Sequence, residues 1–132
     1  MSAKFFDQHN ATNPDNGTVV SNGMTAKSLL KRNSANGSIF VELIADNQMK
    51  LLIGLGAEIC CAQFSTADDD PPYLMATLKT ANLREGFTDF LIGKTPSEVP
   101  LRLCIPISVL LDVAAYFVET GERSSDVEWE AI

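Results

Sequence analysis

The sequence lacks several features on which enzymes, membrane proteins and secreted domains depend. It contains a single histidine, His9, among its 132 residues. No apolar run approaches the ~20 residues that a membrane-spanning helix needs, and the first ten residues lack the apolar stretch and cleavage site of a signal peptide. These absences predict one cytoplasmic domain, which at this length can bury roughly two thirds of its unfolded surface.

Cysteine is scarce and irregularly spaced. Cys60, Cys61 and Cys104 are odd in number and two of them are adjacent, so they do not make a disulfide framework. All three lie in apolar segments, and we interpret them as small buried hydrophobic residues. Because a metal site would need a Cys-x-x-Cys pair or neighbouring histidines, the sequence predicts no metal and no other cofactor.

Basic residues are scarce in two short segments, and these segments account for the net charge of −7 on the whole chain. Residues 1–65 carry equal numbers of acids and bases. The excess of acid lies in residues 66–72, with three aspartates and no base, and in residues 112–132, with six acids against Arg123 alone. Such a protein repels nucleic acid and anionic membrane and attracts a basic protein partner. The alternative is that the acids only keep the protein in solution.

The first third of the chain predicts an arm followed by a helix. Residues 1–17 are rich in Asn, Asp and Gln, which predicts a disordered arm, although Phe5 and Phe6 offer a way to dock it onto the core. Ser21 is a plausible helix N-cap, and the apolar spacing after it predicts a short helix. That helix should end before the turn residues 33–37.

Strand signals dominate the middle of the chain. Apolar residues alternate over three segments, and both faces of these strands are largely apolar, which predicts a sheet covered by helix on at least part of one face. Other strand candidates are less regular. In chain order, the predicted strands cover residues 18–20, 38–45, 48–55, 57–64, 73–78 and 86–92.

The strongest pattern is a second helix close to the C-terminus. Its apolar residues recur at helical spacing, Pro106 suits its first turn, and Gly121 suits a left-handed C-terminal cap. The apolar positions are Ile107, Leu110, Leu111, Ala114, Phe117 and Val118.

A closing strand follows this helix. Its apolar residues, with Trp129 in the core, alternate with an acidic outer row of Asp126, Glu128 and Glu130. Taken together, residues 18–132 predict a single α+β domain: an antiparallel sheet of about six strands with two helices packed on it.

The order of the C-terminal elements resembles the first immunity-protein family of bacterial polymorphic toxin systems. The pattern is a glycine turn, Thr-x-x-x-x-Pro, a proline at a helix start, Phe-x-x-Thr-Gly at its end, then Val-x-Trp. The resemblance spans roughly residues 18–130, but Lys94 stands where the family often has a second glycine. The matching residues are Gly93, Thr95, Pro100, Pro106, Phe117, Thr120, Gly121, Val127 and Trp129.

The resemblance implies that the protein binds and neutralises the toxin domain of its own or a sibling cell. Such toxins are often deaminases that act on nucleic acid. The motif residues look structural, since they form a turn, helix caps and a core aromatic. The resemblance therefore implies a fold and a role but marks no residue that contacts the toxin, and it leaves the toxin's identity and the oligomeric state open.

A nucleic-acid deaminase must hold an anionic strand, so the rim of its active site tends to be basic. An acidic patch that occupies such a rim competes with substrate and speeds association. We therefore predict a toxin-binding surface on the acidic loop before Pro71-Pro72 and on the closing strand. The alternatives are a solvated turn and a charged row that discourages edge pairing. The predicted binding residues are Asp68, Asp69, Asp70, Tyr73, Asp126, Glu128 and Glu130.

Two other classes of function compete with this prediction. An enzyme would need a nucleophile–base pair, a metal cluster or a phosphate-binding loop; Gly54 and Gly56 lack the third glycine and the helix of a dinucleotide-binding motif. A secretion chaperone would also be short, acidic and α+β, but it would hold an unfolded effector segment. We predict a binding protein for a folded partner, with the chaperone as the alternative.

Overall fold

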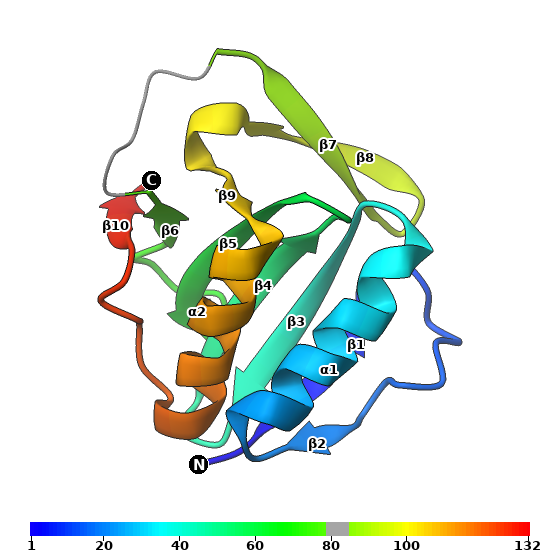
Figure 1. Cartoon of the computed structure of the whole chain (residues 1–132), viewed down its shortest axis with the longest axis vertical. Helices are drawn as coiled ribbons and strands as arrows, with labels where there is room; N and C mark the ends of the chain where they lie inside the picture. The colour runs from blue at the N-terminus through cyan, green and yellow to red at the C-terminus, as the bar shows by residue number, and fades with distance from the viewer. Residues whose placement is uncertain (79–84) are drawn as a thin grey trace.

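The computed structural model describes residues 1–78 and 85–132. Across these residues the fold is α+β, as predicted, with two helices and one largely antiparallel sheet. The two helices lie side by side on the same face of the sheet (Figure 1).

Helices seldom interrupt the strands along the chain, so strands that are neighbours in sequence are mostly neighbours in the sheet. The helices are α1 (Gly23–Asn33) and α2 (Ile107–Thr120), with single 3-10 turns η1 (Ser34–Asn36) and η2 (Leu101–Leu103). The strands are β1 (Ala3–Asp7), β2 (Val19–Val20), β3 (Ile39–Ala45), β4 (Met49–Leu55), β5 (Ile59–Thr66), β6 (Leu74–Thr77), β7 (Phe87–Ile92), β8 (Thr95–Pro100), β9 (Ile105–Pro106) and β10 (Glu128–Ala131).

The main sheet runs in the order β10-β6-β5-β4-β3-β1-β2, with antiparallel pairing throughout. Strand β7 pairs with β8 as an antiparallel hairpin and touches β3 through one parallel pair, Ile39 with Leu91. Strand β9 pairs with the start of β5. The β7–β8 hairpin is therefore a second layer that leaves the main sheet at β3.

The prediction of about six strands was too low, because the described residues contain ten. Strand β1 lies in a polar segment, and β9 is only two residues long. Strand β8 contains Pro96 and Pro100, and proline normally argues against a strand. It is tolerated here because β8 pairs only with β7 and is an edge strand.

Residues 1–17, predicted as a disordered arm, hold strand β1 instead. Phe5 is fully buried, and β1 pairs with β3 over its whole length. The remainder of the segment is a loop that returns to β1, since Gly17 N donates to Phe5 O at 2.8 Å. Polar composition suggested disorder, whereas two tertiary features, a buried phenylalanine and a free sheet edge at β3, stabilise a strand.

Helices and sheet bury the larger apolar core between them. This covered face of the sheet contributes alternate residues of β3, β4 and β5, and α2 contributes Leu110, Ala114 and Phe117. Trp129 packs against the same core, with its ring 6.2 Å from that of Phe64. The prediction that Trp129 belongs to the inner side of the closing strand is confirmed.

The helix ends predicted from the sequence lie close to those observed. Asn22 rather than Ser21 is the N-cap of α1, and its side chain accepts from Thr25 N at 2.9 Å. Pro106 lies one residue before α2, at its N-cap. Gly121 is the C-cap of α2 with a φ of +72°, and its carbonyl accepts from Asn47 Nδ2. The glycine is required there by its backbone conformation.

Candidate functional site

The acidic loop, residues 66–73, connects β5 to β6 and is held in one conformation. Asp69 adopts a left-handed backbone with a φ of +61°, which is uncommon outside glycine. Its amide donates to Thr66 O at 3.0 Å, and the next amide, of Asp70, donates to Thr66 Oγ1 at 3.0 Å. The Tyr73 hydroxyl donates to Asp69 O. The loop is therefore braced from within.

A buried lysine fastens the acidic loop to the sheet. Lys50 is only 5% exposed, and its ammonium group pairs with Asp69 and, at 3.3 Å, with Glu42 Oε2. Burial opposes its charge, but the hydrogen bond that Lys50 donates to Asp69 and the nearby Glu42 carboxylate outweigh burial and raise the pKa of Lys50. Two carboxylates thus share one cation, and Asp69 is tied to the protein itself.

This arrangement separates the predicted loop residues into those bound within the protein and those exposed to solvent. Asp68 and Asp70 are exposed, and neither side chain has an ion-pair partner among the described residues. Asp69 pairs with Lys50, and the hydroxyl group of the half-buried Tyr73 donates a hydrogen bond to Asp69 O within the loop. Asp68 and Asp70 are therefore the two carboxylates of the loop that face solvent without an ion-pair partner among residues 1–78 and 85–132.

The acidic row on β10 also contains both an ion-paired acid and exposed acids. Glu128 and Glu130 project on the opposite side of the strand from Trp129, as alternation requires. Glu130 makes a bidentate ion pair with Arg102 Nη1, at 2.9 and 3.0 Å. Asp126 precedes the strand and is exposed, like Glu128. Two of the three predicted acids therefore lack a cation from the described residues.

The structure brings the loop and β10 to the same edge of the sheet. Strand β10 is the outermost strand and pairs with β6, which begins directly after the loop. Ile132 N donates to Tyr73 O at 3.0 Å, so the chain end lies beside the loop. Glu128, opposite Thr77, lies at the far end of β6. The predicted residues thus form a broken acidic border rather than one compact patch.

A groove on the opposite face from the helices was not predicted. It lies between the sheet and the β7–β8 hairpin and has a volume of about 250 Å³. Its lining is mainly apolar, and it includes Phe40, Leu52, Met75, Val99, Leu103 and Ile132. We call this the open-face groove. The sequence feature that indicated it was the apolar character of both faces of the strands. The sequence alone did not show that the hairpin lies beside one of these faces.

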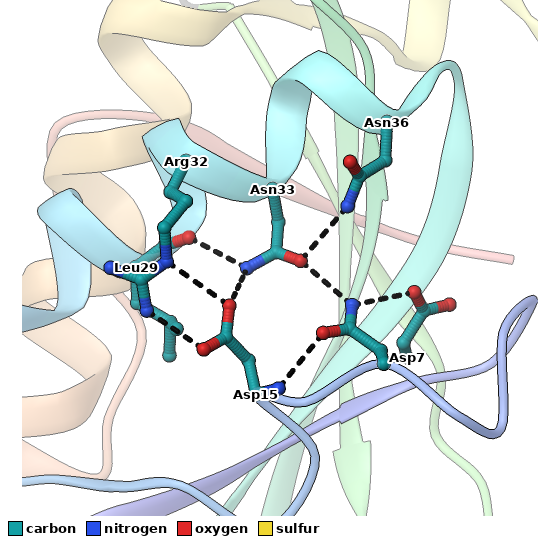
Figure 2. Close-up of polar contacts among 7 residues, drawn as sticks. Asp7, Asp15, Leu29, Arg32, Asn33 and Asn36 are labelled. Carbon is teal, nitrogen blue, oxygen red and sulfur yellow. Dashed lines mark hydrogen bonds and ion pairs between the residues drawn. The ribbon is translucent and has the colours of Figure 1, made fainter.

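A second, polar cavity of about 610 Å³ lies where the loop after β1 meets the end of α1. There the side chain of Asn33, 1% exposed, donates to Asp15 and Leu29 O and accepts from Asn13 and Asn36 (Figure 2). The Arg32 guanidinium donates to both Asp15 oxygens.

The polar groups around this cavity are satisfied by one another. The hydrogen bond from Arg32 lowers the pKa of Asp15, and Asn13 Nδ2 also donates to Asp7 at 2.8 Å. Within the described residues, no buried side-chain nitrogen or oxygen atom lacks a hydrogen-bond partner. The cluster therefore joins the β1 loop to α1 and is a structural tie rather than a binding site.

The groups that could act as nucleophiles or bases are poorly placed for chemistry. Burial raises the pKa of the Cys60 thiol to about 11 and raises that of Cys61 further, and a thiol in this state is inert. His9 Nδ1 accepts from the Lys94 amide at 3.0 Å. Across residues 1–78 and 85–132, no group of three acidic, cysteine or histidine side chains is arranged to hold a metal ion.

Neither α1 nor α2, the helices of the described residues, is long and apolar enough to cross a membrane. No curated protein matches the chain. A family model does match: the immunity protein family Imm1, over residues 13–131. This match covers the helices, the groove, the acidic loop and strand β10. The chain belongs to the Imm1 family of immunity proteins, which bind a toxin in order to neutralise it.

Proposed function

We propose that this immunity protein neutralises a nucleic-acid deaminase by placing an acidic surface on the basic rim of the toxin's active site. A deaminase that acts on a nucleic acid has to attract a polyanion to its pocket. Carboxylates on the immunity protein compete for the same cations and accelerate the encounter of the two proteins. The protein acts by binding in the cytoplasm and takes part in no chemical step.

The observation that supports this proposal is the fixed loop, in which two acids are exposed and have no ion-pair partner among the described residues. Asp68 and Asp70 flank Asp69, which Lys50 and Tyr73 hold in place. Because the loop is ordered before the partner arrives, little conformational entropy is lost when the two carboxylates engage cations. Asp126 and Glu128, both exposed, extend the same negative edge of the sheet.

The partner that fits this surface is a folded, basic toxin domain. Nucleic acid and anionic membrane carry the same sign of charge as the protein and are repelled by it. Cys60, Cys61 and Cys104 are buried thiols rather than disulfides, which suits a reducing compartment such as the cytoplasm. A secretion chaperone would instead bind an extended segment, so the folded state of the partner separates the two functions.

The test reverses the charge of the two unpaired loop acids. The double variant Asp68→Lys/Asp70→Lys should raise the dissociation constant for the folded toxin domain encoded directly upstream by at least about tenfold, measured by calorimetry at physiological salt. Its melting temperature should stay near that of the wild type, because neither side chain pairs within the described chain. Asp69 is left intact, since its reversal would also disturb Lys50.

A matched control reverses two exposed acids elsewhere. Glu58→Lys/Glu85→Lys makes the same change in net charge away from the acidic loop and should alter affinity far less. Equal losses in both variants would show that only total charge matters, and no loss in either would refute the acidic surface. Deamination of single-stranded DNA by the toxin domain, stopped by one equivalent of wild-type protein, tests the class of toxin separately.

A further inference from the structure

The open-face groove lies on the face of the sheet opposite α1 and α2. Registers across the sheet place Glu42, Leu52, Gln63, Met75 and Glu130 in one row on this face. The hairpin covers the neighbouring row, where Phe40 meets Phe90 with 5.4 Å between ring centroids. The groove opens along the boundary between the two rows.

The walls of the groove combine buried and exposed apolar atoms. Met75, Val99 and Leu103 are between 5% and 8% exposed and form its floor and side. Ile92 and Ile132 stand at its margin and are 39% and 60% exposed. Ile92 lies two residues after the buried Phe90, so both side chains leave β7 on the same side. Exposed branched residues beside an apolar hollow are a common sign of an interaction site.

The rim of the groove is acidic. Glu98 lines it directly, and Glu42 and Glu130 end the row that crosses its floor. Among the described residues, Glu42 and Glu130 are ion-paired with Lys50 and Arg102, whereas Glu98 has no ion-pair partner there. Lys4 lies at the β1 edge of the face, opposite Ile44. Among the described residues, Glu98 therefore gives the mouth of the groove an excess of negative charge.

We propose that the open-face groove receives one large apolar side chain that the toxin domain presents within its basic surface. The inference rests on the proposed function and adds the contact that supplies most of the binding energy. A volume of about 250 Å³ is just below the roughly 300–1,000 Å³ of small-molecule pockets and suits a single aromatic or long aliphatic residue. Cations around that residue match the acidic rim, whereas a lipid or an acidic peptide would be repelled.

An anchored side chain and a ring of charges make separate contributions to the complex. Interfaces commonly concentrate their energy in one buried anchor, and the surrounding polar contacts exclude water from it. Rim charges mainly change the rate of association, while loss of an anchor mainly changes the rate of dissociation. The groove and the acidic loop should therefore have different kinetic signatures.

The test is a substitution that makes the groove polar and the protein more acidic at once. Ile92→Asp should raise the dissociation constant for the folded upstream toxin domain at least about tenfold, mainly through faster dissociation. A purely electrostatic surface would bind a basic toxin as well or better after this change. The matched control is Tyr116→Asp on α2, where the side chain is 44% exposed on the helix side; its affinity should stay within about twofold.

A second variant fills the groove without a change in charge. Ser97 lines the groove from β8, so Ser97→Trp should block entry of the toxin side chain and weaken binding by a similar factor. Wild-type affinity in Ile92→Asp or in Ser97→Trp, with a normal circular dichroism spectrum, would overturn the groove and leave the immunity function intact. Failure of the wild-type protein itself to bind the toxin domain would overturn both.

Discussion

The covered face of the sheet and its open face contain different kinds of residue. The C-terminal part of the family motif, from Pro106 to Trp129, lies on the covered face, where Phe117 and Val127 are buried. The open face contains the groove, the paired Lys50 and the acidic border, and it meets the motif at Pro100, which lines the groove. The comparison indicates that the C-terminal part of the motif stabilises the packing of the domain, while the proposed toxin-binding surface lies on the other side of the sheet.

This division explains how one fold can serve against different toxins. A buried helix–sheet interface tolerates little change, because the loss of even one methylene group is felt in a close-packed core. Exposed residues such as Asp68, Ile92 and Glu98 make few contacts within the chain and can change at little cost in stability. Specificity can then vary on the open face without loss of the domain.

The largest expected effect tests the covered face. Phe117 is 1% exposed and its ring lies 6.1 Å from that of Phe64 in an edge-to-face contact. Phe117→Ala should lower the free energy of unfolding by about 3–5 kcal/mol, through lost burial and the cavity left behind. Urea unfolding followed by circular dichroism measures it. Tyr116→Ala, on the exposed side of the same helix turn, is the control and should change stability by less than about 1 kcal/mol.

Toxin binding by Phe117→Ala should fall only as far as the folded population falls. At a temperature where the variant is fully folded, its affinity should match that of the wild type. A variant that folds normally but binds weakly would contradict the assignment of toxin binding to the open face, because it would place a residue of the covered face in the binding surface.

A smaller effect is expected at Lys50, which lies on the open face but is buried. Lys50→Met removes the cation shared by Glu42 and Asp69, whose side chains are 16% and 66% exposed. Removing one partner of a fully buried pair costs about 3–5 kcal/mol, and contact of these carboxylates with water should reduce the loss to about 1–2 kcal/mol. Thermal and urea unfolding measure this loss.

Lys50→Met should also weaken toxin binding, because the acidic loop loses its attachment to β4. Asp69→Asn supplies the matched comparison, since it breaks the same contact from the loop side. The effects of the two substitutions on affinity should be less than additive in the double variant. Fully additive losses would contradict the view that Lys50 acts on the toxin by positioning the loop.

Much of the covered face was predictable from sequence. Its elements follow local patterns that tertiary contacts reinforce. These patterns are the helical spacing of apolar residues that ends at Val118, the helix-capping Gly121, and the alternation of apolar residues in β3–β5. Strand β1 was missed because its stability comes from the burial of Phe5 and from pairing with the edge of β3, and no local pattern predicts either of these tertiary contacts. Strand β8 was missed because its two prolines argue against a strand except at an edge.

The candidate site was predictable only in part. Charge alone selected Asp68, Asp69 and Asp70, but it could not separate the residue that Lys50 neutralises from its neighbours, because Lys50 is 19 positions away from Asp69. The groove joins β4 and β6 to the hairpin residue Ile92, so it exists only after the chain has folded. Apolar residues on both faces of the strands were the one sequence feature that pointed to it.

The smallest expected effect is at the edge of the covered face, in the polar cluster of Figure 2. Asp15 accepts from Arg32 and Asn33, and the hydrogen bond from Arg32 lowers its pKa. Because folding lowers this pKa, the carboxylate adds stability above its unfolded pKa and loses that contribution as the pH falls through its folded pKa. Asp15→Asn should therefore cost less than about 1 kcal/mol at neutral pH.

The gap in unfolding free energy between wild type and Asp15→Asn should narrow between about pH 5 and about pH 2. Urea unfolding at several pH values measures it. Asp112→Asn is the control, since its ion pair with Lys27 joins side chains that are 59% and 44% exposed and should contribute less. A gap for Asp15→Asn that stays constant with pH would mean that shape and neutral hydrogen bonds, rather than charge, hold the β1 loop to α1.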